Sequence, residues 1–399
     1  MTAYLNALGL ICALGSGKRE IAARLFAGDG SGIGPYPREV AGRQLPVGAV
    51  TAALPPLPDH LARCNTRNNR LLLAAALEIE APIRLALERY GAARIGIVLG
   101  TSTSGIQEAS DGIASYYRDG QLPTHYRYAQ QELAAPASFL EDWLGLAGPS
   151  YCISTACTSG ARALQSARRL LAMGICDAVL CGGVDSLCDL TLQGFSALEA
   201  TSGTGCNPFS ANRDGIAIGE AAALFLMTRE RGDDHGIALL GAGASSDAHH
   251  ISAPDPSGQG AVQAMRSALV DAGCDARRIS YLNLHGTATA HNDAMESVAV
   301  AQLFPDGVAC SSTKPMTGHT LGAAGALEAA FCWLALSEFN TDRRLPPHLW
   351  DGQADSQLPP LKLVVPGEAM APATGRPCTM SNSFAFGGNN ISLIIGEAP

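Results

Sequence analysis

The stretch ISYLNLHGTAT, residues 279–289, joins a near-continuous apolar run to a Gly-Thr turn, and this combination occurs twice in the chain. Residues 99–103 read LGTST, at the end of the apolar run ARIGIVLG of residues 93–100. A second pair of similar segments follows these turns in the same order, STACTSG at 154–160 and STKPMTG at 312–318. The shared order indicates an internal duplication. We place the divide in the polar connection TRERGDDHG, which gives an N-terminal half of 1–235 and a C-terminal half of 236–399.

Strand-like and helix-like segments alternate along the rest of the chain. The runs DAVLCGGV (177–184) and AAALFLM (221–227) are apolar enough for buried strands. The stretches GARALQSARRLLAMG (160–174) and GQGAVQAMRSALVDAG (258–273) have the spacing of amphipathic helices. This alternation predicts an α/β fold in which helices cover the sheets.

Composition excludes several classes of protein. The 399 residues are 47% hydrophobic and carry a net charge of −9 without a basic stripe, which argues against a nucleic-acid partner. No uncharged apolar run reaches the roughly 18 residues of a membrane span, and no basic residue precedes the first apolar patch as in a secretory signal. We therefore expect a cytoplasmic protein without membrane insertion. Twelve cysteines without a C-x-x-C pair favour reduced thiols over a metal site or a disulfide framework.

Cys157 stands out within CISTACTSGARAL, residues 152–164. Apolar residues recur after it at helical spacing, so a helix is predicted to begin near residues 158–160. Unpaired amides and about half a positive charge gather at a helix start, an environment that favours a thiolate. The alternative is a small buried side chain, because free cysteine is among the most often buried residue types.

Two histidines and a lysine could complete a site with Cys157. His285 ends a predicted strand before a Gly-Thr turn, although a core histidine would show the same pattern. Lys314 and His319 flank a turn that opens a helix rich in Gly and Ala, which could also be a packing helix with a surface lysine. A thiolate can hold an acyl group as a thioester, and two neutral imidazoles can donate to one developing oxyanion.

The segment NSFAFGGNN, residues 382–390, adds a mobile element to this set. Gly387 and Gly388 allow unusual backbone angles, so the turn could bring an amide N–H to a reacting carbonyl and let Phe386 swing. The adjacent His249 and His250 would point to opposite faces of a strand, which favours loop histidines over metal ligands.

These segments, together with RDGIAIGE (213–220), SSDAHH (245–250), NLHGTATAHNDAMES (283–297) and STKPMTGHTLGAAGALEA (312–329), occur in the order found in one family. The chain resembles the β-ketoacyl-acyl carrier protein synthases, the elongating ketosynthases of fatty acid and polyketide synthesis. The resemblance implies the thiolase fold, with duplicated halves in a five-layered α-β-α-β-α arrangement. It also implies an acyltransferase that forms C–C bonds by decarboxylative condensation of malonyl-carrier protein with an acyl group.

The resemblance carries roles onto individual residues. It implies that Cys157 is the acylated nucleophile and that His285 and His319 stabilise the enolate. Lys314 would support the histidines and pair with Glu296. The amides of Cys157 and Phe386 would form the oxyanion hole, with Phe386 as the gate.

The resemblance also identifies the substrate carrier and the partners. Thr287 and Thr289 would contact the phosphopantetheine arm of acyl carrier protein, which brings the substrates, so no cofactor is expected. The chain would form a homodimer or a heterodimer with a chain-length-factor paralogue. Arg63, Arg67 and Arg70 would lie on one face of a helix and could dock the acidic carrier protein, or form an ordinary solvated face.

Two departures from the family pattern affect the prediction. Ala385 and Asn389 replace a glycine and a threonine beside the gate. The sequence TSTSGI (101–106) resembles, more weakly, the ketosynthases of aryl polyene pathways. The alternatives are a thiolase acting on coenzyme A esters, with Cys378 as a second cysteine, and a non-catalytic chain-length-factor-type subunit.

Overall fold

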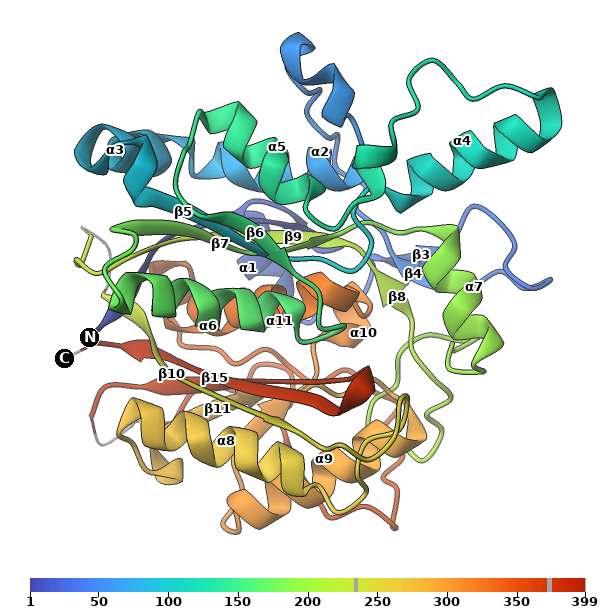
Figure 1. The fold of residues 1–399 in the computed structure, drawn as a ribbon. Helices are drawn as coiled ribbons and strands as arrows, with labels where there is room; N and C mark the ends of the chain where they lie inside the picture. The colour runs from blue at the N-terminus through green and yellow to red at the C-terminus, as the bar shows by residue number, and fades with distance from the viewer. Residues whose placement is uncertain (233–235, 372–374, 399) are drawn as a thin grey trace.

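The computed structural model describes residues 1–232, 236–371 and 375–398 (Figure 1). The predicted divide between residues 235 and 236 adjoins residues 233–235, which lie outside this description.

The N-terminal half builds a sheet of five main strands in the order β1–β9–β7–β5–β6, and β1 pairs with β10 to join it to the sheet of the C-terminal half. Strand β5 is parallel to both β6 and β7, whereas β9 is antiparallel to β7 and β1. The bounds are β1 Ala3–Cys12, β5 Ile95–Gly100, β6 Ser150–Ile153, β7 Ala178–Asp185 and β9 Ala221–Thr228.

The C-terminal half repeats this plan in the order β10–β15–β14–β11–β12. Strand β11 is parallel to β12 and β14, and β15 is antiparallel to β14 and β10. The bounds are β10 Ile237–Ser246, β11 Ile279–Asn283, β12 Ala309–Ser311, β14 Cys378–Ala385 and β15 Asn389–Glu397, with the short β13 Lys362–Leu363 beyond β12.

The two Gly-Thr turns occupy equivalent places in these sheets. The segment LGTST begins with the last two residues of β5 and turns after them, and HGTAT comes after β11. The strand order therefore confirms the duplication. The run at 279–286 leaves the sheet earlier than predicted, since β11 ends at Asn283.

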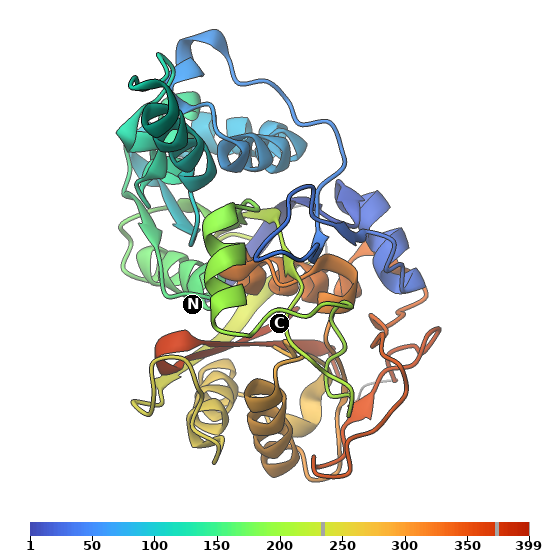
Figure 2. The same ribbon diagram turned by 90° about the vertical axis from the view of Figure 1, so that its right-hand side faces the viewer.

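Five layers stack in the order helix, sheet, helix, sheet, helix, as predicted (Figures 1 and 2). Helices α2 (Arg67–Glu78), α3 (Glu80–Tyr90) and α5 (Ala135–Leu144) cover the outer face of the N-terminal sheet. Helices α6 (Ser159–Ala172) and α11 (Ala324–Leu336) form the layer between the sheets. Helices α8 (Gln259–Ala272) and α9 (Ala290–Leu303) cover the C-terminal sheet.

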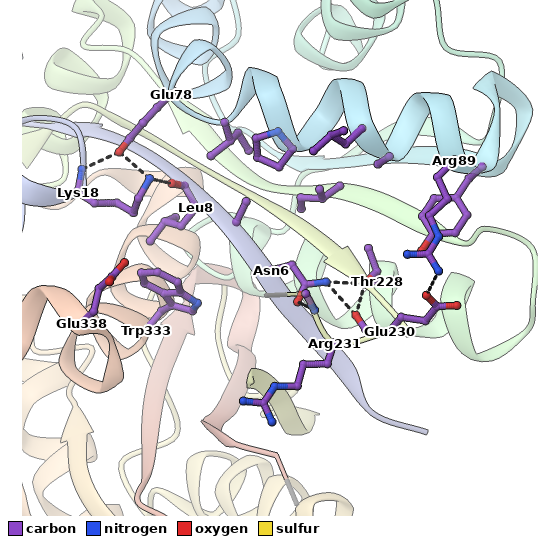
Figure 3. Close-up of a pocket in the computed structure, with 18 of the residues that line it drawn as sticks. Asn6, Leu8, Lys18, Glu78, Arg89, Thr228, Glu230, Arg231, Trp333 and Glu338 are labelled. Atoms are coloured by element: carbon purple, nitrogen blue, oxygen red, sulfur yellow. Dashed lines mark hydrogen bonds and ion pairs between the residues drawn. The ribbon is translucent and has the colours of Figure 1, made fainter. Parts of the chain in front are cut away.

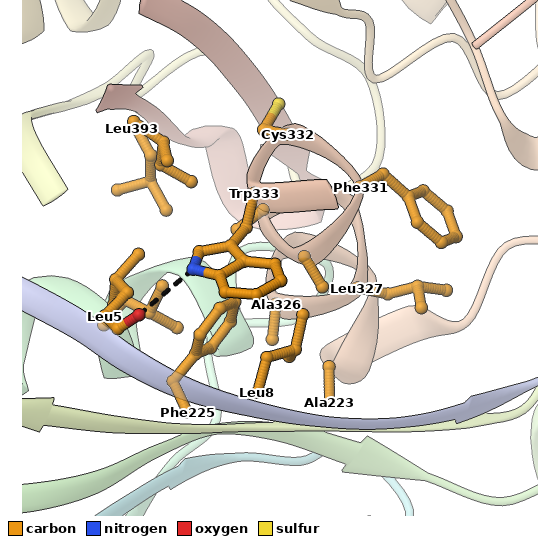
Figure 4. Close-up of a cluster of buried hydrophobic side chains, with 14 of the residues drawn as sticks. Leu5, Leu8, Ala223, Phe225, Ala326, Leu327, Phe331, Cys332, Trp333 and Leu393 are labelled. Carbon is orange, nitrogen blue, oxygen red and sulfur yellow. Dashed lines mark hydrogen bonds between the residues drawn. The ribbon is translucent and has the colours of Figure 1, made fainter. Parts of the chain in front are cut away.

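Helix α11 is apolar except for Glu328, and it is enclosed by both sheets and by α6. All its residues from Ala324 to Ala335 are buried, which is typical of a central helix. The Trp333 ring lies between strands of both halves and its Nε1 donates to Leu5 O at 3.0 Å (Figure 4). Small residues let α6 approach closely, because a Cβ on Gly160 would lie 2.8 Å from Ala326 N. The two halves thus share one core that fixes the starts of α6 and α11 relative to each other.

A small separate sheet of β3 (Ile33–Pro35), β4 (Pro46–Gly48) and β8 (Ile218–Gly219) lies beside the central layer. Among the described residues, no helix is both long and apolar enough to cross a membrane.

Candidate active site

Cys157 lies in the tight turn between β6 and α6, where the sequence places a helix start. Thr158 is the N-cap of α6, and its Oγ1 donates to Thr155 O at 2.7 Å. The Thr155 amide donates to Ser159 Oγ at 2.9 Å. Ala156 has a left-handed backbone with φ 53°, a conformation that persists only where the surrounding contacts enforce it. The turn therefore holds the cysteine in one direction.

His285 and His319 come from the C-terminal half and meet Cys157 across the boundary between the halves. His319 Nε2 lies 3.0 Å from Cys157 Sγ. The two imidazole rings are nearly perpendicular, with centroids 5.3 Å apart. One ligand atom from each of the three residues lies within 4.8 Å of the others.

These three side chains line a cavity of about 560 Å³. Thr287, Thr289 and Phe386 also line it, together with Phe195 and Phe384. Thr287 Oγ1 and Thr289 Oγ1 are 3.0 Å apart. The predicted nucleophile, histidines, threonines and gate thus share one cavity.

Lys314 pairs with Glu328, and the predicted pairing with Glu296 is wrong. Lys314 begins the short helix α10 (Lys314–Thr317) and is 1% exposed. Its Nζ donates to Glu328 on α11 and to His285 O. Burial raises the pKa of Glu328, and the Lys314 charge offsets part of this rise. The ion pair is therefore outside the cavity lining, and Lys314 Nζ bonds to the backbone carbonyl of His285.

Glu296 holds the turn that carries His285. Its carboxylate accepts the amides of His285 at 2.8 Å and Gly286 at 2.7 Å. Asp293, one turn earlier on α9, accepts the amides of Thr287 and Ala288. Burial raises the pKa of Glu296 to about 7, although these backbone donors favour the carboxylate. Glu296 faces the turn amides rather than Lys314 because α9 begins directly after the turn and its first two turns lie over it.

The electrostatics of the site favour neutral groups. Burial raises the pKa of the Cys157 thiol to about 12, an effect that the Lys314 charge partly opposes. The prediction that the helix start favours a thiolate is therefore wrong, because burial is the largest influence on the pKa of this thiol. Burial and the Lys314 charge lower the pKa of both histidines well below the usual range.

The histidines have their free protons on the cavity side. No protein group among the described residues bonds to the Nδ1 atom of His285 or His319. Because a buried N–H needs an acceptor, the tautomer with the proton on Nε2 is favoured, and His319 Nε2 faces Cys157 Sγ. Both rings can then donate to negative charge that develops in the cavity.

The three ligand atoms are also close enough to hold a metal ion. Lys314 would repel a cation there, since its charge already acts on both histidines. Metal-bound histidines usually donate their second N–H to an acceptor, and the two Nδ1 atoms have none in the described part of the chain. The site therefore fits thioester chemistry better than a resident metal.

The predicted gate consists of η7 (Phe386–Gly388) between β14 and β15. Phe386 is 37% exposed and its ring packs against Phe195 of α7 (Asp189–Ala197) with centroids 5.7 Å apart. Gly387 and Gly388 have φ 78° and 72°, the left-handed region that favours glycine. The departures Ala385 and Asn389 face each other across the β14–β15 pair, so the hairpin closes despite them.

The prediction that Arg63, Arg67 and Arg70 share one helix face is wrong, while their docking of carrier protein stays a prediction. Arg63 lies in a separate 3-10 helix, η1 (Asp59–Cys64), and Thr66 caps the start of α2. Arg67 binds the buried carboxylate of Glu220, and Arg70 donates to two backbone carbonyls at residues 54 and 55. The three residues share no helix face because the cap interrupts the helix, and each has a partner within the chain, since Arg63 pairs with Asp142 at 2.6 Å.

A second cavity of about 490 Å³ lies between α3 and η6 (Glu338–Asn340) (Figure 3). Its charged groups include the ion pairs Lys18–Glu78 and Arg89–Glu230. Its described lining contains neither cysteine nor histidine, so it offers no nucleophile for the chemistry above.

Sequence reasoning missed three residues of the site, Glu328, Asp293 and Phe195. Glu328 had a visible signal, since it is an acidic residue within the otherwise apolar helix GALEAAFCWLAL. Asp293 lies in the segment NLHGTATAHNDAMES but has no spacing that predicts its bonds to the turn. Phe195 has no signal, because its contact with Phe386 arises from the packing of α7.

Fold and site together define a condensing enzyme of the thiolase fold. The chain belongs to the β-ketoacyl synthase family, whose N-terminal domain model matches residues 21–232 and whose C-terminal domain model matches residues 237–349. A 3-oxoacyl-[acyl-carrier-protein] synthase 2 of Synechocystis is 32% identical over 78% of this chain and 76% of its own length. One from Staphylococcus aureus is 30% identical over 85% of this chain and 84% of its own length. The ketosynthase ApeO of Xenorhabdus doucetiae, solved in complex with its chain length factor ApeC, is 45% identical, with a TM-score of 0.93 over 100% of this chain and 98% of the ApeO chain.

Proposed function

We propose that this chain is an elongating β-ketoacyl-acyl carrier protein synthase that holds the growing acyl group as a thioester on Cys157. The observation that carries the proposal is the meeting of Cys157 Sγ with the His285 and His319 rings in the cavity. Family membership supports the same reaction class, C–C bond formation by acyl transfer.

The first half-reaction moves the acyl group from carrier protein to Cys157. The sulfur attacks the thioester carbonyl, the bond to the pantetheine sulfur breaks, and the thiol proton of Cys157 passes to that departing sulfur. The amides of Cys157 and Phe386 are proposed to donate to the tetrahedral oxyanion. The helix start at α6 stabilises the negative charge that develops on the sulfur.

The second half-reaction forms the carbon–carbon bond. Malonyl-carrier protein loses carbon dioxide, and the Nε2–H groups of His285 and His319 donate to the enolate oxygen that forms. The enolate carbon attacks the thioester on Cys157, whose sulfur leaves and takes up a proton. The product is a β-ketoacyl-carrier protein two carbons longer.

The remaining residues bind and admit the substrates. Thr287 and Thr289 are proposed to contact the phosphopantetheine arm, which supplies the substrate without any resident cofactor. Phe386 is proposed to gate entry, with Gly387 and Gly388 as its hinge.

The alternative functions fit the site less well. Cys378 is buried at the start of β14 and does not line the cavity, so a thiolase would lack its second cysteine. A non-catalytic chain-length-factor-type subunit would have no use for a cysteine held 3.0 Å from His319 Nε2.

We further propose an aryl polyene pathway for this ketosynthase. The resemblance of TSTSGI to that subtype and the 45% identity to ApeO support it. Extension assays with a panel of acyl-carrier proteins test this proposal, and a preference for unsaturated acyl groups over saturated ones of equal length is expected. The cytoplasmic location remains a prediction.

A heterodimer with a chain-length-factor paralogue is the proposed assembly, because the ketosynthase ApeO was solved in complex with its chain length factor. Helix α4 (Ile106–Asp119) and the loop after it extend away from the N-terminal half (Figure 1). Tyr116 and Tyr117 on α4 and Tyr128 at the start of η3 (Tyr128–Gln131) are exposed, with Tyr117 84% exposed. Exposed apolar patches of this kind mark protein interfaces. Light scattering of the chain alone and co-expressed with such a paralogue separates the heterodimer from a homodimer. Tyr117→Asp should weaken whichever dimer forms.

Intact-mass spectrometry after incubation with acyl-carrier protein tests the proposed function. An acyl mass on the wild-type chain that is absent from Cys157→Ala is expected. An unmodified wild-type chain with every acyl group offered would favour the non-catalytic subunit.

A further inference from the structure

Asp185 is a fully buried carboxylate at the end of β7, and the mechanism above does not use it. Its Oδ1 accepts the Thr101 hydroxyl at 2.8 Å, the Ser102 amide at 2.7 Å, and both the amide and the hydroxyl of Thr103. Its Oδ2 accepts the Gly322 amide at 2.5 Å. No lysine or arginine pairs with it within the described ranges, so backbone and hydroxyl donors alone compensate its burial.

These bonds join the two halves of the molecule. Thr101, Ser102 and Thr103 belong to the Gly-Thr turn after β5, whereas Gly322 lies in η5 (Leu321–Ala323), three residues after His319. The close approach requires glycine, because a Cβ on residue 322 would lie 2.7 Å from Asp185 Oδ2. The preceding Leu321 has φ 50°, a strained conformation that neighbouring contacts must maintain.

His319 needs this support because its ring has no second hydrogen bond. Catalytic histidines are commonly oriented by a group bonded to the other ring nitrogen, yet His319 Nδ1 has no partner in the described part of the protein. The ring is therefore placed by its backbone. On one side, the His319 amide donates to Ala217 O at 2.6 Å and its carbonyl accepts the Gly219 amide at 2.9 Å. On the other side, the Gly322 amide is held by Asp185.

We propose that Asp185 is a positioning residue for His319, holding the His319 loop against the N-terminal half and so fixing the contact between His319 Nε2 and Cys157 Sγ. This inference rests on the proposed function of that pair.

The substitution Asp185→Asn separates the two sets of bonds. An amide has one oxygen, which can serve the four donors at Oδ1, and one NH₂ group, which would then face the Gly322 N–H donor. The variant thus keeps the turn and breaks the link to the His319 loop. Asp177→Asn is the matched control, because Asp177 directly precedes the same strand and pairs at the far end with Arg94 and Arg229.

Condensation kinetics with acyl- and malonyl-carrier protein decide between positioning and a merely structural role. We expect Asp185→Asn to lower kcat about 100-fold, the cost of a misplacement of about 1 Å, with KM changed less than about threefold. Asp177→Asn should stay within about twofold of wild type. Gly322→Ala disturbs the same contact from the other side, should show the same kcat loss, and decides the matter if the asparagine variant does not fold.

A wild-type kcat in the folded Asp185→Asn or Gly322→Ala variant would overturn the inference, as would a rise of KM alone. A crystal structure of either variant should show a longer distance from His319 Nε2 to Cys157 Sγ, and an unchanged distance would also overturn it. Wild-type protein that never acquires an acyl group would instead refute the proposed function.

Discussion

Replacing Lys314 by methionine should both destabilise the fold and slow the reaction, for different reasons. The side chains of Lys314 and Glu328 are 1% and 3% exposed, so the variant leaves a buried carboxylate without its counter-charge. Removing one partner of a buried ion pair costs about 3–5 kcal/mol of the free energy of unfolding. The loss of the donor to His285 O contributes part of this cost, about 1–3 kcal/mol.

The destabilisation should depend on pH in a defined direction. Burial raises the pKa of Glu328 in the folded chain above its unfolded value, so the folded state binds more protons than the unfolded state. Stability then rises as the pH falls through the folded pKa. Without the Lys314 charge the rise is larger, so the gap between variant and wild type should narrow as the pH is lowered from 8 to about 5.5.

The double variant Lys314→Met/Glu328→Leu separates stability from function. Replacing a buried ion pair by apolar residues of similar size is often neutral, so urea unfolding followed by circular dichroism should place the double variant within about 1 kcal/mol of wild type. Its kcat should remain about 100-fold low, because His285 O still lacks its donor and the His285 loop can shift. A double variant as unstable as the single one, or a single variant that loses less than about 1 kcal/mol, would refute this reasoning.

Three further predictions follow from the site and its surroundings. Arg67→Ala should cost about 2 kcal/mol of unfolding free energy in urea titrations, because it leaves buried Glu220 without its counter-charge while Arg67 itself is partly exposed. The KM for carrier-bound substrate should stay unchanged. A raised KM with normal stability would instead support a docking role for Arg67. Gly387→Ala should lower the free energy of unfolding by about 1–2 kcal/mol and lower kcat, because the φ of Gly387 is 78°. The control Gly194→Ala, at an open helical position, should stabilise the fold by up to about 1 kcal/mol. Equal effects of the two substitutions would argue against the hinge. Nitrogen-15 NMR of the two site histidines at pH 6 should show neutral rings protonated at Nε2, because burial and Lys314 lower both pKa values; imidazolium signals would contradict this.

The duplicated fold and the main site residues could be predicted from the sequence because short-range patterns encode them. Apolar runs and Gly-Thr turns gave the strands β5 and β11, and the onset of helical spacing placed Cys157 before α6. The motifs around His285 and His319 then identified residues that the structure gathers in one cavity.

The partners of the charged residues could not be predicted in this way. Glu296 and Glu328 both lie in segments typical of the family, and only packing decides which one reaches Lys314. Helix α9 directs Glu296 at the amides of its own turn, while the central helix α11 directs Glu328 at Lys314. The three arginines failed as a face because Thr66 accepts the Asn69 amide and starts a new helix, a cap that the sequence pattern TRNN can show.

The Cys157 environment shows a second limit of sequence reasoning. A helix start is visible in sequence, but the depth at which it is buried is not. Desolvation raises the pKa of the thiol to about 12, an effect that the onset of helical spacing does not reveal.

In vitro chain extension tests whether this chain condenses malonyl-carrier protein with an acyl group held on Cys157. The purified chain, with its partner subunit if the heterodimer forms, is incubated with acyl- and malonyl-carrier protein, and the carrier-bound product is analysed by mass spectrometry. We expect a β-ketoacyl chain two carbons longer with wild-type protein and none with Cys157→Ala. Equal product from Cys157→Ala, or none from wild-type protein with any acyl group, would contradict it.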